Sequence, residues 1–256
     1  DPGLMSHPAM SASSLPGVII QPTRGLAALQ LRAVWEYREL LYFLAWRDIK
    51  VRYRQTALGV LWIVMQPLLS TVIFTLLFGG LLRVPSGGAP YALFALAALA
   101  PWQYFASSLG RIGTSLVNSA HLISKVYFPR LIIPLSTVIS SLVDFAIAFA
   151  VLLILLAAYR VPLAINVLWL PLFLLLAVVT ALGFGLWLAA LNVRYRDVNY
   201  LIPFLLQIWM YMTPVVYGST LIPERYRWLL ALNPMTGVVE GFRWTLLGGS
   251  MTEFVP

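Results

Sequence analysis

Long apolar stretches are the feature of this sequence that most limits what it can fold into. A helix that crosses a bilayer needs about 20 mainly apolar residues, because each residue advances it by about 1.5 Å and the hydrocarbon is about 30 Å thick. Inside that layer every backbone polar group needs an internal partner. The sequence therefore predicts an all-α, polytopic bundle of membrane helices. Five stretches meet the length requirement, at about residues 57–82, 91–109, 131–159, 163–192 and 198–222.

The composition also indicates a chain whose main solvent is hydrocarbon. Hydrophobic residues make up 61% of the sequence and charged residues 10%, whereas soluble domains have about 25% charged residues. In a soluble protein, the formal net charge of +8 would point to nucleic acid. Here the basic residues lie between the apolar stretches, which indicates membrane topology. No nucleic-acid partner is expected.

The positions of lysine and arginine predict the orientation of the chain. Seven basic residues precede the first apolar stretch, three lie between the second and third, and two lie between the fourth and fifth. Cytoplasmic loops carry the excess of basic residues. The side with these twelve residues, and with it the N-terminus, is therefore predicted to be cytoplasmic. The opposite side has Arg83, Arg160, Arg225, Arg227 and Arg243.

The two ends of the chain differ from its apolar middle. Residues 1–28 are interpreted as a flexible N-terminal tail. Residues 29–256 are interpreted as a single transmembrane domain. Within it, residues 223–256 mix charges with apolar pieces that are too short to cross a bilayer. We expect short interfacial or re-entrant helices there, on the periplasmic side.

An amphipathic helix is predicted at residues 29–50, ahead of the first apolar stretch. Apolar side chains recur there with a helical period, and Arg32, Glu36 and Glu39 lie on another side. Such a helix lies along the membrane surface. The two interpretations are a plain membrane anchor and an anchor that also contacts a partner protein. The basic residues expected among anionic lipid headgroups are Arg47, Lys50, Arg52 and Arg54.

The sequence contains no motif for chemistry of its own. It has no cysteine, and His7 and His121 lie far apart, so no metal site is expected. No G-x-x-x-x-G-K-[ST] phosphate loop occurs, and no serine has a plausible histidine base nearby. We therefore expect a chain that is not an enzyme and that binds no ATP or other cofactor. The single G-x-G, at Gly183 and Gly185, lies inside an apolar stretch and predicts close approach of a neighbouring helix.

Asp144 is the single ionisable side chain deep inside an apolar stretch. A charge at that depth is costly unless it is paired or protonated. One acidic residue does not make a proton relay, because coupled transporters place several acids or histidines in the membrane. We expect a structural hydrogen bond between Asp144 and a polar neighbour, with a functional role as the alternative.

Two stripes of aromatic and amide side chains lie on the first and fifth stretches. Aromatic rings can stack on the apolar face of a sugar while amides bond its hydroxyls. The pattern therefore predicts a channel along which a polysaccharide slides. Ordinary packing, with aromatic belts at the membrane surfaces, is the alternative interpretation. The residues are Trp62, Gln66, Tyr200, Phe204, Gln207 and Tyr211.

The segment between the second and third stretches, residues 110–130, is amphipathic and can form a helix. A segment that only connected two spans could be shorter and more polar. We therefore expect a docking helix for a soluble partner protein there.

Short motifs occur in order through most of the chain, from about residue 40 to residue 249. In this combination the chain resembles the membrane subunits of ABC type-2 exporters for lipopolysaccharide O-antigen, capsular polysaccharide and teichoic acid. The motifs are Arg52-Tyr53-Arg54-Gln55-Thr56, Leu58-Gly59 with Trp62, Gln66-Pro67, Phe128-Pro129-Arg130 with Pro134, Asn192-Val193-Arg194-Tyr195-Arg196-Asp197, Thr213-Pro214 and Asn233-Pro234.

The resemblance implies a homodimer in the bacterial inner membrane, bound to two separate ATP-binding cassette subunits that carry ATP and Mg²⁺. A lipid-linked polysaccharide, with O-antigen as the expected cargo, would pass from cytoplasm to periplasm. The family has six spans, so a sixth is expected beyond Pro256. The resemblance assigns the coupling to the ATPase to a short helix with Asn118, Leu122, Ile123, Lys125 and Phe128.

Three other functions are compatible with the sequence, one of which is a membrane scaffold with no transport role. The first is a type-2 ABC exporter of drugs or small lipids, in which the aromatic stripes would form a hydrophobic gate. The second is a membrane-embedded glycan-modifying enzyme, which would need acidic or histidine groups near a headgroup that the sequence does not offer.

Overall fold

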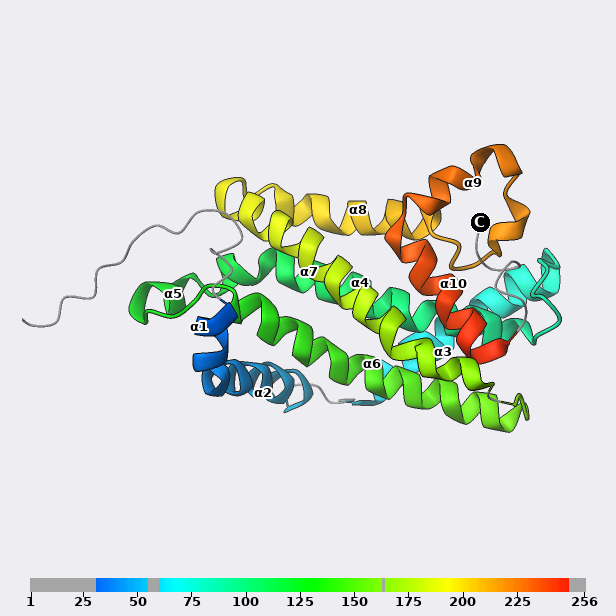
Figure 1. Cartoon of the computed structure of the whole chain (residues 1–256), viewed down its shortest axis with the longest axis horizontal. Helices are drawn as coiled ribbons and strands as arrows, with labels where there is room; N and C mark the ends of the chain where they lie inside the picture. Colours follow the sequence, from blue (N-terminus) through cyan, green and yellow to red (C-terminus); the bar gives the residue numbers. More distant parts are fainter. Residues whose placement is uncertain (1–30, 55–59, 163, 249–256) are drawn as a thin grey trace, which may run out of the picture.

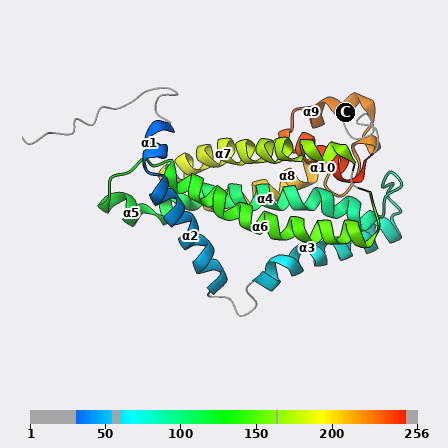
Figure 2. The same ribbon diagram turned by 60° about the horizontal axis from the view of Figure 1, so that its bottom comes forward.

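The computed structural model describes residues 31–54, 60–162 and 164–248, and within them every regular element is a helix. The longest helices run roughly along the long axis of the molecule (Figure 1). The short helices α1 and α5 lie at one end of this bundle, and α9 lies at the other, next to one end of α10 (Figures 1 and 2). The predicted all-α bundle is confirmed.

The helix α4, Tyr91–Asn118, is the central element of the bundle. In its most apolar 18-residue segment 78% of the residues are buried, against 11–33% in the other helices that are long enough to cross a membrane. Small residues on α4 let its neighbours approach closely. At Gly113, for example, a Cβ atom would lie 2.6 Å from Cδ1 of Ile202 in α8. The bundle is therefore packed around α4.

Four helices are long and apolar enough to span a bilayer, and they correspond to the first four predicted stretches. The first, Val64–Leu81, consists of most of α3 (Val60–Phe74) followed by the π-helix η2 (Thr75–Leu81). The second is α4 and the third is α6 (Ile132–Ala158). The fourth, Ile165–Arg194, consists of the 3-10 helix η3 (Ile165–Trp169) followed by α7 (Leu170–Arg194). The second helix runs nine residues beyond its predicted end at residue 109, because residues 110–118 continue the helical pattern and bury Ile112 and Ser115.

The fifth predicted stretch is helical over a shorter range than expected. Helix α8, Val198–Met212, has 15 residues and ends ten residues before the predicted limit at residue 222. Thr213 is extended and Pro214 follows it. The residue before a proline is disfavoured in the helical conformation, which accounts for the early end. At 1.5 Å per residue α8 is about 22 Å long. The count of five spans stays a prediction.

The predicted close approach at the G-x-G of α7 is confirmed for one of the two glycines. A Cβ atom at Gly185 would lie 2.7 Å from Cγ2 of Ile112 in α4, so only glycine fits there. At Gly183 a Cβ atom would meet nothing within 4 Å, and the prediction is wrong for this residue. Residues two positions apart on an α-helix lie on nearly opposite sides of it. Of the two glycines, only Gly185 therefore faces α4.

The N-terminal amphipathic segment forms two helices, α1 (Leu31–Glu36) and α2 (Arg38–Arg54). Helix α2 lies beside the end of α6 that is nearer α5 (Figures 1 and 2). A small second core, here called the α2 core, joins α2 to the start of α6: its buried residues are Leu44, Phe128, Ile132 and Ile133. Residues 29 and 30 of the predicted helix lie outside the described residues, as do residues 1–28.

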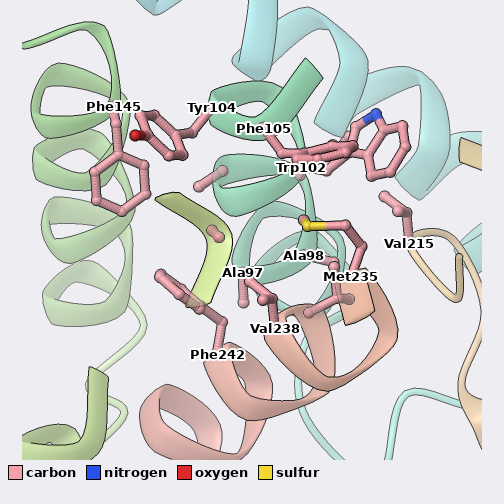
Figure 3. Close-up of a cluster of buried hydrophobic side chains, with 14 of the residues drawn as sticks. Ala97, Ala98, Trp102, Tyr104, Phe105, Phe145, Val215, Met235, Val238 and Phe242 are labelled. Atoms are coloured by element: carbon pink, nitrogen blue, oxygen red, sulfur yellow. The ribbon is translucent and has the colours of Figure 1, made fainter. Parts of the chain in front are cut away.

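The predicted short helices after residue 223 are α9 (Glu224–Ala231) and α10 (Pro234–Leu247). Helix α10 packs its apolar side against the bundle: Figure 3 shows Val238 and Phe242 pointing toward Ala97 and the neighbouring residues of α4. The ring of Phe242 also meets Phe145 of α6 edge to face, with centroids 6.0 Å apart. Residues 249–256 of the predicted periplasmic segment lie outside the described residues.

Candidate functional site

The carboxylate of Asp144, near the middle of α6, is held by side chains from two other helices. Arg111 of α4 places Nη2 2.9 Å from its Oδ2. Arg52, near the end of α2, forms a second ion pair with the same oxygen. The hydroxyl of Tyr53 donates a hydrogen bond of 2.9 Å to Oδ1. The predicted hydrogen bond between Asp144 and a polar neighbour is therefore found, within a larger ionic cluster that joins α2, α4 and α6.

The local sequence explains how α2 reaches this carboxylate. Arg52 and Tyr53 are consecutive residues in the last turn of α2, so one long and one shorter side chain can converge on Asp144. Nη2 of Arg52 also donates to the hydroxyl of Ser140, one turn before Asp144 on α6, at 3.5 Å. Burial, and then the hydrogen bond to Asp144, raise the pKa of Tyr53 well above its ordinary value. The Tyr53 hydroxyl therefore stays protonated and remains a donor.

Two cavities border this cluster. The first has a volume of about 490 Å³ and lies between α3, α4 and α6, with Arg111 and Asp144 in its wall. Its other polar lining residues include Gln66, Ser70, Gln103 and Ser107. The second has a volume of about 450 Å³ and lies between α2, α4 and α6. Arg111 borders both cavities, and Arg52 borders the second.

The predicted channel residues lie on outer surfaces of the single chain. Trp62 is 57% exposed, and on α8 Tyr200 is 84% exposed, with Phe204 and Tyr211 also largely exposed. Gln207 is exposed beside them. Of the six residues, only Gln66 also lines one of the cavities described above. The single chain therefore does not bring the two stripes together into an enclosed site.

The predicted coupling residues divide into exposed and internal ones. Helix α5, Ala120–Lys125, lies at the end of the bundle (Figure 1), and Asn118 and Lys125 are exposed. Leu122 and Ile123 are partly buried against the α2 core. Phe128 is only 6% exposed and belongs to that core. Its side chain therefore faces the inside of this chain.

The four basic residues expected at the membrane surface also divide. Arg47, Lys50 and Arg54 are exposed, and Arg47 pairs with Asp48 at 2.9 Å. Arg52 instead turns toward Asp144. The expectation for Arg52 is corrected, because its guanidinium pairs with the partly buried carboxylate of Asp144, which solvent screens less than it screens an exposed charge.

Two of the short motifs meet at the far end of α8. The indole Nε1 of Trp209 donates to Oδ1 of Asn233 at 2.8 Å, and Nδ2 of Asn233 donates to the hydroxyl of Thr213 at 2.9 Å. Asn233 also caps α10, because its Oδ1 accepts from the backbone N–H of Met235. The motif residues at 213 and 233 thus fix the end of α8 to the start of α10.

A second charged cluster, which the sequence analysis missed, lies in α10. Arg243 is fully buried and pairs with Glu240 at 3.3 Å. Its guanidinium donates to the backbone carbonyls of Pro214 and Val215, each at 2.7 Å, and lies 3.6 Å from the centroid of the Phe94 ring. Arg243 therefore holds the segment after α8 against α4. The prediction of orientation counted Arg243 as a charge of the opposite side. It did not consider that Glu240 and Arg243, three residues apart in an otherwise apolar helix, can pair with each other.

Burial controls the titration of this pair, which lies outside the four helices that are long enough to span. Desolvation raises the pKa of Glu240 to about 7, against the opposing effect of Arg243. Desolvation lowers the pKa of Arg243 to about 10, against the opposing effect of Glu240. Near neutral pH the guanidinium is therefore charged, and the carboxyl is close to its midpoint.

Comparison with known proteins places these features among transporters. Residues 39–247 match the family described as ABC-2 type transporter. An O-antigen export system permease protein RfbA of Myxococcus xanthus is 34% identical over 215 residues, which cover 83% of this chain and 82% of the relative. One of Klebsiella pneumoniae is 31% identical over 214 residues, with 83% and 82% covered. The polysialic acid transport protein KpsM of Escherichia coli is 24% identical over 214 residues, with 82% and 81% covered.

Proposed function

This chain belongs to the ABC-2 type transporter family, and from that premise we propose that it is the membrane subunit of an ATP-driven polysaccharide exporter. The observation that carries the proposal is the similarity, at up to 34% identity and over about four fifths of each chain, to proteins named as O-antigen export permeases. We propose lipid-linked O-antigen as the cargo and transfer from cytoplasm to periplasm as the direction.

The energy for transport comes from a separate subunit. The sequence has no phosphate loop, so the ATP and Mg²⁺ belong to the ATP-binding partner. The protein is accordingly a transport subunit and not an enzyme. ATP-binding subunits and a polysaccharide substrate are its partners as a member of this family.

A second copy of the chain supplies the other half of the channel in this proposal. On α8 the exposed face combines Tyr200, Phe204 and Tyr211 with the amide of Gln207. An amide that faced hydrocarbon would lose its hydrogen bonds with water, at a cost of several kcal/mol. Pairing of two such faces around a hydrated path avoids that cost. Trp62 and Gln66 of α3 are proposed to complete the lining.

The exposed side of α5 and its neighbours is proposed to dock the ATP-binding subunit. Asn118 and Lys125 are exposed there, together with Val126 and Tyr127. This end of the bundle is proposed to be cytoplasmic, because α1, α5 and most of the basic residues gather there. The membrane is proposed to be the inner membrane of a bacterium. Phe128 would transmit movement of α5 to the α2 core, since it packs against both.

Depletion of the chain in cells, combined with co-purification, tests the proposed function. The chain should co-purify with ATP-binding subunits from its own cell, and its depletion should cause a lipid-linked glycan to accumulate on the cytoplasmic face. Restoring the chain should clear the accumulated glycolipid. Stable co-purification with glycolipid export unchanged after depletion would contradict the proposed cargo, and ATPase activity that responds to drugs but not to glycolipid would favour another class of exporter.

A further inference from the structure

The ionic cluster of Arg52, Arg111 and Asp144 has an excess of positive charge. Both arginines bind the same oxygen of one carboxylate, so the three side chains together have a formal charge of +1. The second cavity adds Arg47 and Asp48, which pair with each other and contribute no net charge. Counted over these three side chains, the cluster thus presents a net charge of +1 to two polar cavities.

Arg111 also has unused hydrogen-bonding capacity. Its Nη2 binds Asp144 and its Nε donates to the backbone carbonyl of Ser107 at 3.1 Å. Its Nη1 is buried, and no hydrogen-bond partner for it is found among the residues that the structure describes. A buried donor without a partner is costly, and a buried charge without a full counter-charge is costlier still. Both costs would be removed by an anion with oxygen acceptors.

The position of Arg111 along α4 indicates where such an anion would come from. Arg111 lies 20 residues after Tyr91, the first residue of α4 (111 − 91 = 20). At 1.5 Å per residue this is about 30 Å, which is also about the thickness of the hydrocarbon. If α4 enters one surface of the bilayer near Tyr91, Arg111 lies at the level of the other. Lipid phosphate groups lie at this level.

We propose that Arg52 and Arg111 bind the phosphate group of a membrane lipid, and that Asp144 is the carboxylate which neutralises them when that lipid is absent. The planar fork of a guanidinium matches the oxygens of a phosphate and can bind two of them at once. This inference rests on the proposed function, under which the lipid is the one that carries the glycan. The first cavity then receives the sugar next to the phosphate.

The lining of the first cavity fits this use. Gln66, Gln103 and Ser107 place amide and hydroxyl groups around it, and Tyr104 and Phe145 place aromatic rings there. These are the groups that bind the hydroxyls and the apolar face of a sugar. Its volume of about 490 Å³ lies within the range of about 300–1,000 Å³ that is usual for small-molecule sites.

Two substitutions change the charge of the cluster in opposite directions, and a third, outside the cluster, is the control. Asp144→Asn raises it by one and frees both guanidinium groups from their carboxylate, so phosphate should bind more tightly. Arg111→Gln lowers it by one and removes the fork, so phosphate should bind more weakly. The matched control is Arg38→Gln: Arg38 is exposed at the start of α2, and among the described residues its guanidinium contacts the carbonyl and ring of Trp35, away from the cluster.

Binding to the complex of this chain with its ATP-binding subunits, purified in a nonionic detergent, tests the proposal. Farnesyl phosphate, farnesol and inorganic phosphate are titrated separately by isothermal titration calorimetry. Farnesyl phosphate should bind more tightly than the other two. Asp144→Asn should increase its affinity about tenfold and Arg111→Gln should decrease it at least about tenfold, as expected for a charge-assisted hydrogen bond. Arg38→Gln should leave it unchanged.

Two results would overturn the proposal. If Asp144→Asn and Arg111→Gln both weaken binding, or if neither changes it, the cluster only holds the helices together. If inorganic phosphate binds as tightly as farnesyl phosphate, the site is not one for lipid. Should Arg111→Gln fail to fold, Arg111→Lys replaces it, because it keeps the charge and loses the fork; weaker binding supports the proposal and unchanged binding overturns it.

Export in cells separates failure of this inference from failure of the proposed function. Glycolipid export at the unsubstituted rate in the Arg111→Gln strain would overturn the phosphate site and leave the exporter intact. If the unsubstituted chain exports no glycan at all, the proposed function fails, and the order of affinities in calorimetry still decides the phosphate site.

Discussion

Arg52 of α2 and Asp144 of α6 lie 92 positions apart in the sequence and form an ion pair. This contact ties a helix outside the four long spans to the middle of a spanning helix. It also gives the partly buried carboxylate of Asp144 the charged partner that its burial requires. Arg111 of α4 binds the same carboxylate oxygen. Movement of α2 relative to the bundle would therefore move the positive charge of Arg52 and change the electrostatic potential at Arg111.

Removing the charge of Asp144 should destabilise the chain. Asp144→Asn leaves Arg52 and Arg111 without their carboxylate, and we expect a loss of about 2 kcal/mol, or about 6 °C in Tm. This is less than for a fully buried pair, because the three side chains are 19–32% exposed. Thermal unfolding in detergent measures the loss. The control is Asp48→Asn, which breaks the more exposed Arg47–Asp48 pair and should cost less than about 1 kcal/mol.

Alanine at the two glycines of α7 should have opposite consequences. Gly185→Ala places a methyl group 2.7 Å from Cγ2 of Ile112, and overpacking of this kind costs about 1–3 kcal/mol. Gly183→Ala meets no atom within 4 Å and should be neutral or stabilise α7 by up to about 1 kcal/mol. Thermal unfolding of the two variants decides. Equal stability of both would contradict the close packing of α7 against α4.

Two residues of the predicted coupling segment should respond differently to substitution. Phe128→Ala empties a buried site in the α2 core and should reduce stability by about 3 kcal/mol or more. Lys125→Glu reverses an exposed charge and should change stability by less than about 0.5 kcal/mol. The same Lys125→Glu variant should retain less ATP-binding subunit on purification. Full retention of the subunit would remove Lys125 from the docking surface.

Loss of the exposed rings of α8 should slow export without loss of assembly. Phe204→Ala with Tyr211→Ala removes two rings that are each at least 60% exposed in the single chain, so little internal packing is lost. The rate of glycan export is measured beside the amount of assembled complex. Tyr159→Ala, at an exposed ring just after α6, is the control and should leave export unchanged. Export at the normal rate in the double variant would assign the α8 rings to lipid contact.

The stability of the chain should depend on pH through Glu240. Its pKa is raised by burial to about 7 in the folded chain, above the ordinary value of about 4.3 in the unfolded chain. The folded state therefore binds the proton more firmly. This contribution to stability is fully present below the unfolded pKa, falls as the pH rises toward 7, and is constant above it.

The measurement is Tm in detergent between pH 5 and pH 8 for the chain and for Glu240→Gln, which has no proton to lose. The difference in Tm between the two should change across this range, with the unsubstituted chain losing more stability as the pH rises. A constant difference would show that Glu240 titrates outside this window.

The sequence was sufficient to predict the long helices, because spanning helices have a strong and local signal. The apolar stretches that became α3, α4, α6 and α7 need only length and composition to be recognised. The limits of α8 were harder to predict, since the residues after Met212 stay apolar while Thr213 and Pro214 end the helix. Hydropathy alone cannot detect this change from helical to extended backbone.

The ionic cluster could be predicted only in part. The depth of Asp144 required some partner, but a partner 92 positions away follows from how α2 packs, and no local pattern gives that. Arg243 was missed for the same reason, because its acceptors are carbonyls of a loop about 28 residues earlier. Phe128 was expected to face a partner protein and lies inside, since the α2 core forms only when α2 folds back onto α6.

Transport by the reconstituted complex is the decisive measurement of ATP-driven glycan export by this chain. The chain and its ATP-binding subunits are placed together in liposomes with a lipid-linked O-antigen added to the side that holds the ATP-binding subunits, and glycan on the opposite side is measured. We predict that glycan crosses only when ATP is hydrolysed by the partner subunit. Glycan that crosses at the same rate without ATP, or that never crosses while ATP is hydrolysed, would contradict it.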